Sequence, residues 1–316
     1  MASFDAVNYA IRPNKAIERK IVFAGLSQLT RILDWSTYRY VGLGSVWFVD
    51  FLIAHKSLSI QSMVSIEADL TGYERALFNC PFSCIDVIRG DTSLIIPTLD
   101  LGSRPSIVWF DYDTSIDGPV LPDISMLMSQ CAPNSVLIVT INAKKNALPK
   151  NDPNGVLLNE ETSLRRIAGD LVPTPLPSRR LQQKHYPGLL REIVSNQFRN
   201  CAANSARSEI FVELFDLEYA DGTPMITVGG ILAAPETAER VRTLVSSPAW
   251  QGFVSAAIKV PPLTLKEKLT LDQMMPCSAP PIRAELEAVG LWLTPEQIAA
   301  YHQHYKHYPI FGELFS

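Results

Sequence analysis

Residues 38–50 read Tyr-Arg-Tyr-Val-Gly-Leu-Gly-Ser-Val-Trp-Phe-Val-Asp, and they join two apolar runs through a glycine turn. The first run, 38–41, has the composition of a buried parallel strand. The second run, 46–54, has helical length when it is extended to Lys56. A strand, a glycine turn and a helix bring backbone N–H groups up to a nucleotide-like ligand. Because glycines also end strands for steric reasons, the residues that follow must decide between these two interpretations.

The composition is that of a globular protein with a large core. The 316 residues are 47% hydrophobic and 19% charged, with a net charge of −4, which excludes a disordered chain. The acidic balance argues against general nucleic-acid binding and against an anionic membrane surface as partner. No apolar run reaches the roughly 18 residues of a membrane span, and the first residues lack the pattern of a signal peptide. The five cysteines do not have zinc-site spacing, so we expect reduced thiols and a cytoplasmic location.

Apolar, strand-like runs alternate with helix-like segments from residue 38 to residue 142. The later strands are expected at 62–67, 84–89, 106–110 and 135–141. This alternation is typical of a doubly wound parallel sheet. A polar residue follows each of these strands, namely Glu67, Asp91, Asp111 and Asn142. Since ligands bind at the carboxyl edge of open parallel sheets, we expect these side chains to face a common ligand.

The alternation ends after Asn142. Residues 143–208 are rich in turn signals, and we interpret them as an insertion over the ligand edge. Residues 209–219 and 225–232 read as two strands joined by the turn Ala-Asp-Gly-Thr at 220–223. Residues 261–316 read as a small helical appendage with room to dock a protein partner. We therefore expect an N-terminal helical segment (1–37), a Rossmann-like domain (38–260) that carries the insertion, and the appendage (261–316).

An amphipathic helix is predicted before the glycine turn, over residues 14–33, with Asn14 as its N-cap. Four basic residues cluster around its start: Arg12, Lys15, Arg19 and Lys20. A solvent-exposed helix face is the simpler interpretation of such a cluster. The alternative is that Arg12, Lys15 or Arg19 faces an anionic ligand beside the glycine turn.

Five features of the sequence together resemble class I S-adenosylmethionine-dependent methyltransferases. They are the glycines after strand one, the acid that ends strand two, the Gly-Asp after strand three, the acid after strand four and the closing hairpin. The resemblance covers residues 38–142 and 209–232. It implies an α/β fold: a Rossmann-like, doubly wound, mostly parallel seven-stranded sheet that ends in an antiparallel hairpin. The chain departs from the family motif at Tyr40, where an acid is usual, and at Val46, where a third glycine is common.

The resemblance implies that S-adenosylmethionine (SAM) is the cofactor. In this family the acid after strand two binds the ribose hydroxyls, and the Asp after strand three binds the adenine amino group. The matching residues are Glu67 and Asp91, whose carboxylates are suitable hydrogen-bond acceptors for these groups. The glycine turn leaves room for the methionine part. The expected cofactor-binding residues are Gly42, Gly44, Ser45, Glu67, Ala68, Asp91, Thr92 and Asp111.

A finer similarity is to O-methyltransferases, including the metal-dependent kind. Residues 109–114, Trp-Phe-Asp-Tyr-Asp-Thr, match the stretch that this kind carries after strand four. Asn142 matches its asparagine after strand five, but Ile141 replaces a metal-binding Asp. The similarity implies Asp111 or Asp113 as the catalytic base. A Mg²⁺ site made by Asp111, Asp113 and Asn142 is the weaker expectation.

We expect methyl transfer from SAM to an oxygen of an unidentified acceptor, and two alternatives stay open. One is a protein that binds SAM or a partner without transferring the methyl group, which the departures at Tyr40 and Val46 favour. The other is a nicotinamide-dependent oxidoreductase, against which the closing hairpin argues. Glu67 and Asp91 also have a purely structural interpretation, as caps of the helices that follow them.

Overall fold

The computed structural model describes residues 12–44, 46–145, 148–254 and 256–310. Within them a seven-stranded sheet has the order β3-β2-β1-β4-β5-β7-β6. The strands are β1 (Arg39–Leu43), β2 (Met63–Glu67), β3 (Ile85–Arg89), β4 (Ser106–Asp111), β5 (Ser135–Asn142), β6 (Ile210–Ala220) and β7 (Pro224–Ala233). The first five strands are parallel, and β7 is antiparallel to both β5 and β6. This confirms the predicted α/β fold with its closing hairpin.

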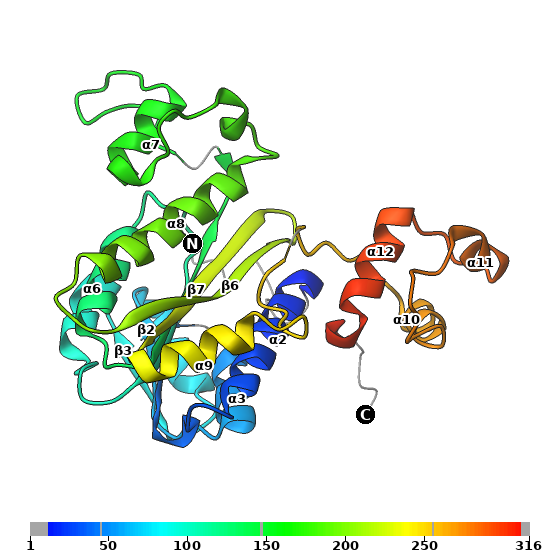
Figure 1. Cartoon of the computed structure of the whole chain (residues 1–316), viewed down its shortest axis with the longest axis horizontal. Coiled ribbons are helices and arrows are strands. Elements are labelled where there is room, and N and C mark those ends of the chain that lie inside the picture. The colour runs from blue at the N-terminus through cyan, green and yellow to red at the C-terminus, as the bar shows by residue number, and fades with distance from the viewer. Residues whose placement is uncertain (1–11, 45, 146–147, 255, 311–316) are drawn as a thin grey trace.

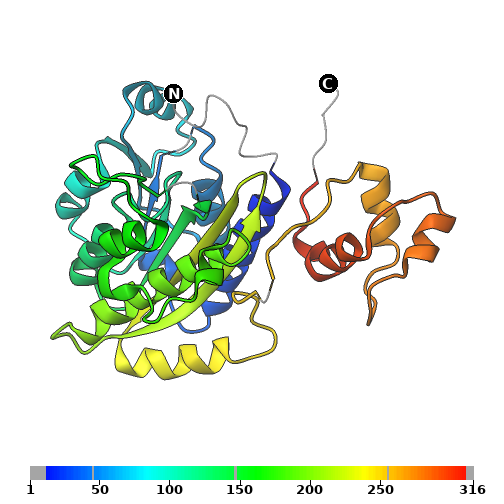
Figure 2. The same ribbon diagram turned by 90° about the horizontal axis from the view of Figure 1, so that it is seen from above.

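Helices cover both faces of the sheet (Figures 1 and 2). Those that pack around the sheet are α2 (Pro13–Leu29), α3 (Val49–Leu58), α4 (Leu70–Asn79), α5 (Thr92–Ile95), α6 (Val120–Gln130), α7 (Glu160–Ala168), α8 (Tyr186–Ala203) and α9 (Pro235–Val245). The appendage adds α10 (Leu265–Asp272), α11 (Arg283–Ala288) and α12 (Pro295–His304). Helices α2, α3 and α9 lie on one face, and α6 and α8 lie on the other.

The strands near the middle of the sheet bury both of their faces. In β4, Ile107 and Trp109 belong to the core under α2 and α3, whereas Val108 and Phe110 belong to the core under α6 and α8. Each of these four side chains is at most 2% exposed. Because neither face meets solvent, the strand is continuously apolar and does not alternate.

The order of the strands reverses beside β1, which has β2 on one side and β4 on the other. The chain therefore builds the sheet outward in one direction through β3 and then in the opposite direction from β4. In open α/β sheets the ligand crevice lies outside the carboxyl ends of the strands at such a reversal. The topology thus marks the ends of β1 and β4 as the place to look for a site.

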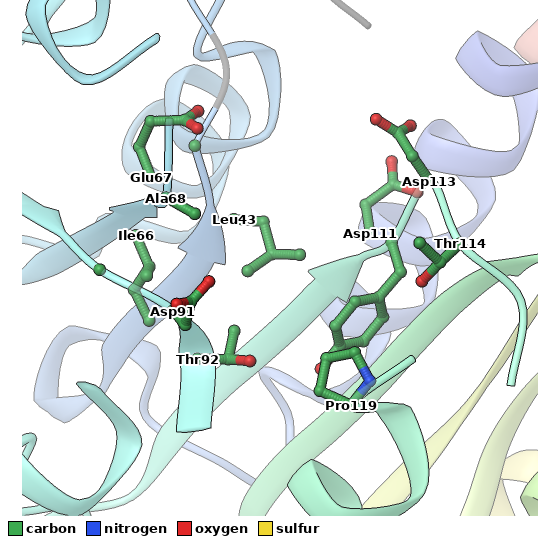
Figure 3. A pocket seen from close by; sticks show the side chains of 13 residues that line it. Leu43, Ile66, Glu67, Ala68, Asp91, Thr92, Asp111, Asp113, Thr114 and Pro119 are labelled. Atoms are coloured by element: carbon green, nitrogen blue, oxygen red, sulfur yellow. The ribbon is translucent and has the colours of Figure 1, made fainter. Parts of the chain in front are cut away.

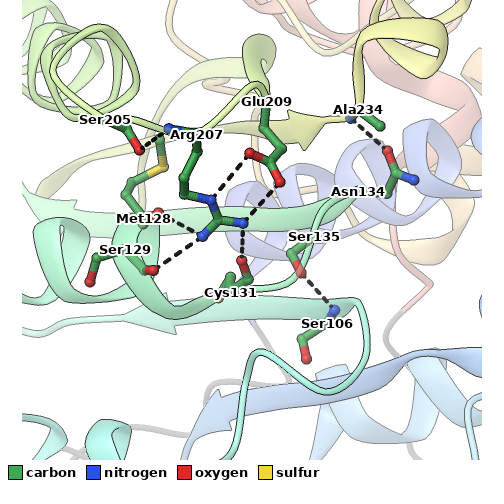
Figure 4. A network of polar contacts seen from close by, with 10 residues as sticks. All are labelled: Ser106, Met128, Ser129, Cys131, Asn134, Ser135, Ser205, Arg207, Glu209 and Ala234. Carbon is green, nitrogen blue, oxygen red and sulfur yellow. Dashed lines mark hydrogen bonds and ion pairs between the residues drawn. The ribbon is translucent and has the colours of Figure 1, made fainter.

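Arg207, just before β6, fixes the end of the insertion to the rest of the domain (Figure 4). Its guanidinium group donates hydrogen bonds to the carbonyl oxygens of Ser129 and Cys131, at 3.1 and 2.7 Å, where α6 ends. It also forms an ion pair with Glu209 at 3.2 Å. The last carbonyls of a helix lack partners within the helix, so a cation is well placed there. This contact anchors β6 against α6.

The start of α2 is held by the turn between β6 and β7. The Asp221 carboxylate accepts hydrogen bonds from the backbone N–H groups of Asn14 and Lys15, at 3.2 and 2.8 Å. The side-chain amide of Asn14 donates to the Ala220 carbonyl, at 2.8 Å. The prediction of Asn14 as the N-cap is therefore wrong, because the helix starts at Pro13 and a residue from another element caps it.

Two helices of the appendage begin with side-chain caps. Thr264 and Thr294 each accept a hydrogen bond from a backbone N–H in the first turn of α10 and α12. Tyr301 and Tyr308 belong to the same hydrophobic core as α2 and α3. The division of the chain at residues 37 and 260 stays a prediction. Among the described helices, none combines the length and the apolar character that a membrane span requires.

Candidate functional site

A cavity of about 360 Å³ lies at the carboxyl ends of β1, β2, β3 and β4 (Figure 3). Of the residues that we expect to bind the cofactor, those that line it are Gly44, Glu67, Ala68, Asp91, Thr92 and Asp111. Asp113 also lines it. In Figure 3, Glu67 and Asp91 lie on one side of the space, and Asp111 and Asp113 lie on the opposite side. The cavity therefore brings the predicted cofactor residues together with the predicted catalytic residues.

Gly44 and Glu67 lie beside each other in the wall of this cavity. A Cβ atom at Gly44 would lie 2.6 Å from Glu67 Oε2 and 2.7 Å from Glu67 Cβ, so only glycine fits beside this side chain. Glu67 does not cap α4, because Asp69 is the N-cap and accepts the Gly72 N–H. Burial raises the pKa of Glu67, and a hydrogen bond from the Asp69 N–H opposes the shift. The alternative interpretation, that Glu67 serves only as a helix cap, is therefore wrong.

Asp91 stands at the N-cap position of α5, but its side chain makes no capping hydrogen bond. The preceding Gly90 has a φ of +154° and donates its N–H to the Glu67 carbonyl, at 3.0 Å. A side chain at Gly90 would be strained in this conformation and would press on Ile95. The turn thus directs Asp91 into the cavity wall instead of into the helix backbone.

One expected cofactor residue does not contribute to this wall, and another lies outside the described residues. Gly42 lies within β1 and does not line the cavity. A Cβ atom there would be 3.1 Å from the rings of Phe51 and Tyr40, so the packing of α3 on β1 accounts for this glycine. Ser45 lies outside the described residues.

A second cavity, of about 190 Å³, adjoins the first. It is formed by the start of α2, the ends of β4 and β5, and the hairpin. Its lining comprises Arg12, Lys15, Asp111, Asp113, Asn142, Tyr219, Thr223 and Met225. Asp111 and Asp113 line both cavities. The structure thus places Asp111, Asp113 and Asn142 around one space, as their positions at neighbouring strand ends predict.

Lys15 is buried in the wall between α2 and the sheet, with a side chain that is 2% exposed. Its Nζ lies 2.6 Å from Asp111 Oδ2 and 3.3 Å from Glu18 Oε2. The rings of Trp109 and Tyr219 flank it, with centroids at 5.1 and 5.3 Å, which is cation–π distance. Burial lowers the pKa of Lys15, but Asp111 and Glu18 raise it by more, so the net pKa lies well above its ordinary value. Lys15 is therefore a permanent cation.

A directed chain of hydrogen bonds fixes Glu18 in this arrangement. The indole N–H of Trp109 donates to Thr140 Oγ1 at 3.0 Å, and Thr140 and Thr227 are 2.8 Å apart. Thr227 in turn donates to Glu18 Oε1 at 2.6 Å. Because the single hydroxyl hydrogen of Thr227 goes to Glu18, Thr140 must donate to Thr227, and Glu18 Oε1 is the final acceptor of the chain. Glu18 Oε2 is then the oxygen that faces Lys15.

The simpler interpretation of the basic cluster as a solvent-exposed face is wrong for Lys15 and Arg19, which are 2% and 6% exposed. Arg19 pairs with Asp50 at the start of α3. Only Lys20 of the helix fits the exposed-face interpretation. Sequence reasoning missed Glu18 altogether. The helical spacing did indicate it. Lys15 and Glu18 are three residues apart, and Glu18 is four residues before the fully buried Val22. Both charged residues therefore lie on the apolar stripe of the helix.

The model of the putative O-methyltransferase family matches residues 7–316. The chain belongs to this family. It is a SAM-dependent methyltransferase of class I, and SAM is its cofactor. None of the curated proteins matches this sequence.

Several solved structures are similar to this methyltransferase. Trm1 from Pyrococcus horikoshii in complex with S-adenosyl-L-methionine has 12% identity and a TM-score of 0.45, over 72% of this chain and 57% of that chain. A putative O-methyltransferase from Klebsiella pneumoniae has 13% identity and a TM-score of 0.37, over 73% and 96%. A SAM-dependent methyltransferase from Mesorhizobium loti has 13% identity and a TM-score of 0.39, over 66% and 99%.

The residues around the second cavity do not suit a divalent metal. Asp111 is already paired with the Lys15 ammonium group, and Asn142 Oδ1 accepts a hydrogen bond from the Lys144 N–H at 2.8 Å. Ile141 is fully buried and has no oxygen to offer. Among the described residues, no group of three or more His, Cys, Asp and Glu side chains converges on a metal position. Burial raises the pKa of Asp111, and the Lys15 charge opposes this shift.

Proposed function

We propose that this methyltransferase transfers the methyl group of SAM to an oxygen of an acceptor that occupies the second cavity. The observation that carries the proposal is that Asp111 and Asp113 line both cavities. A cofactor in the larger space and an acceptor in the smaller one would then meet at two carboxylates. Alignment of two reactants in this way supplies a large part of the acceleration in methyl transfer.

In the first cavity, we assign the ribose hydroxyls of SAM to Glu67 and the adenine amino group to Asp91. Both carboxylates are acceptors, and neither is used to cap a helix. Gly44 permits close approach of the backbone beside Glu67. Ala68 and Thr92 complete the wall around the nucleoside. The methionine end of SAM would extend from this wall toward Asp111.

SAM supplies a methyl group on a positively charged sulfonium, which becomes the neutral thioether of S-adenosylhomocysteine when that group leaves. The bond between methyl and sulfur breaks as the bond between methyl and the acceptor oxygen forms. The hydroxyl proton of the acceptor must then go to a base in the chain. We assign this role to Asp113, whose carboxylate lines both cavities. Asp111 would orient the acceptor.

The test uses SAM labelled with ¹³C in the methyl group, mixed with the protein and a fractionated extract of small molecules. NMR distinguishes a methoxy carbon from carbon bound to nitrogen or sulfur. We expect a labelled methoxy product and loss of its formation in Asp113→Asn. Label that appears only on nitrogen would overturn the oxygen assignment. SAM binding without any transferred label would favour the alternative of a binding protein that does not transfer the methyl group.

We also propose a cytoplasmic location, on the basis of the cysteines. All five are free thiols in the structure, and Cys131 is fully buried. Unpaired cysteines are typical of reducing compartments. Fluorescence microscopy of the tagged full-length chain tests this assignment. A protein partner on the appendage stays a proposal as well, which affinity capture with and without residues 261–316 would test.

A further inference from the structure

The Lys15 ammonium group lines the second cavity, beside Asp111, one of the two carboxylates that both cavities share. We propose that Lys15 is the fixed cation of the acceptor site and takes the position beside Asp111 that a divalent metal would otherwise fill. This inference rests on the proposed function, in which Asp111 orients the acceptor. It gives the site a cation that is part of the chain.

The position of Lys15 is determined from every side. Asp111 and Glu18 contact its Nζ at 2.6 and 3.3 Å, and two aromatic rings flank it. Its backbone N–H is held by Asp221 across the hairpin turn, at 2.8 Å. A cation fixed at both its backbone and its head group has little freedom to leave Asp111.

The same arrangement disfavours a second cation. A divalent ion bound to Asp111 would lie close to the buried Lys15 charge, 2.6 Å from the Asp111 carboxylate, and the two cations would repel each other. The amide oxygen that Asn142 would have to offer is bonded within its own turn. Lys15 thus acts through Asp111 as a positioning residue: it holds the carboxylate in place and balances its charge.

The first experiment measures binding of Mn²⁺ to the wild-type protein and to Asp111→Asn by electron paramagnetic resonance. We expect no binding that depends on Asp111 up to about 1 mM Mn²⁺, the weak end of natural divalent sites. Binding to the wild type that Asp111→Asn abolishes would overturn the proposal. The measurement needs only the folded wild-type protein and one variant that keeps the shape of the side chain.

The second experiment is a double-mutant cycle on thermal stability with Lys15→Met, Asp111→Asn and the double variant. Lys15→Met leaves a buried carboxylate without its cation, so we expect Tm to fall by about 5–10 °C. Adding Asp111→Asn should recover at least half of this loss, because the nearer of the two carboxylates that Lys15 pairs with, Asp111 and Glu18, is then neutral. Lys20→Met is the matched control, since Lys20 is an exposed cation on the same helix.

If the two substitutions lower Tm additively, the proposal is overturned. Additive changes in Tm would mean that Lys15 stabilises the protein independently of the Asp111 charge. If Lys15→Met does not fold, the Mn²⁺ measurement alone decides. Neither experiment uses SAM or an acceptor. Failure of the proposed function would appear instead in the labelling experiment, as label on nitrogen or as no transferred label, so the two failures are distinguishable.

Discussion

Glu67 is the side chain on which the position of the cofactor depends most. Its carboxylate lies at the end of β2, against Gly44 and inside the first cavity. We predict that Glu67→Ala keeps the fold and weakens SAM binding by about 1–3 kcal/mol, from loss of hydrogen bonds to a charged group. Calorimetry measures this change. Glu74→Ala is the matched control, because Glu74 is exposed on the helix that follows. If both variants bind SAM as tightly as the wild type, Glu67 is not part of the site.

The affinity for SAM should also depend on pH through Glu67. Its carboxyl must be ionised to accept two hydroxyl hydrogens, and burial raises its pKa above the ordinary value. As pH falls through this raised pKa, Glu67 takes up a proton and binding weakens. We therefore predict that wild-type affinity falls at a higher pH than the ordinary pKa of glutamate would give. Glu67→Gln should flatten this part of the profile, and an unchanged profile would contradict the prediction.

Single residues differ in how far their role can be predicted from sequence. Glu67, Asp91 and Asp111 are predictable because each follows an apolar strand, and strand ends meet at one edge of the sheet. The pairing of Lys15 with Asp111 is not predictable in this way, because it arises only when α2 packs on one face of the sheet with its first turn beside the end of β4. The apolar stripe of the helix marks Lys15 and Glu18 as buried charges, but no local pattern indicates that Asp111, far along the sequence, is the partner.

At the scale of elements, α2 and the hairpin turn form one unit. Asp221 binds the N–H groups of Asn14 and Lys15, and so caps the helix from which Lys15 projects. We predict that Asp221→Ala lowers the free energy of unfolding by about 0.5–2 kcal/mol, as for the loss of an N-cap. Chemical denaturation measures this loss. Asp221→Asn keeps one acceptor oxygen and should lose less, and equal losses in both variants would refute the capping role.

The boundaries of elements were predicted less well than their existence. The helix expected from residue 46 begins at Val49, because Phe48 has a φ of +48° and cannot be helical. The helix expected to run to residue 33 ends at Leu29. The apolar spacing predicted too long a helix there, because Leu33 and Trp35 are buried although the helix has ended. A hydrophobic period reports burial, and burial continues beyond a helix wherever the chain stays against the core.

At the scale of the whole molecule, the appendage should make stability depend on pH. His304 is 5% exposed, and burial lowers its pKa to about 4. The unfolded chain takes up a proton as pH falls through about 6.5, whereas the folded chain does not until about 4. Stability is therefore lost between these values. We predict that the free energy of unfolding falls by about 1–3 kcal/mol over this range. His304→Gln should abolish this loss. His185→Gln, at an exposed position, should leave it unchanged. Denaturation at several pH values checks this.

The overall topology could be predicted because strands, helices and the closing hairpin follow each other at spacings that few folds share. The second cavity could not, since α2, β4, β5 and the hairpin build it jointly. Along the chain, the first half of the sheet separates α2 from β4, and the insertion separates β5 from the hairpin. A cavity of this kind exists only in the assembled molecule.

The most direct test of the account is a crystal structure of the protein with S-adenosylhomocysteine. The account predicts ribose hydroxyls at Glu67, the adenine amino group at Asp91, and the sulfur directed toward Asp111 and Asp113, where the two cavities meet. Lys15 should remain on Asp111 in the complex. A ligand bound elsewhere, or one whose sulfur faces away from both carboxylates, would contradict the proposed site of methyl transfer.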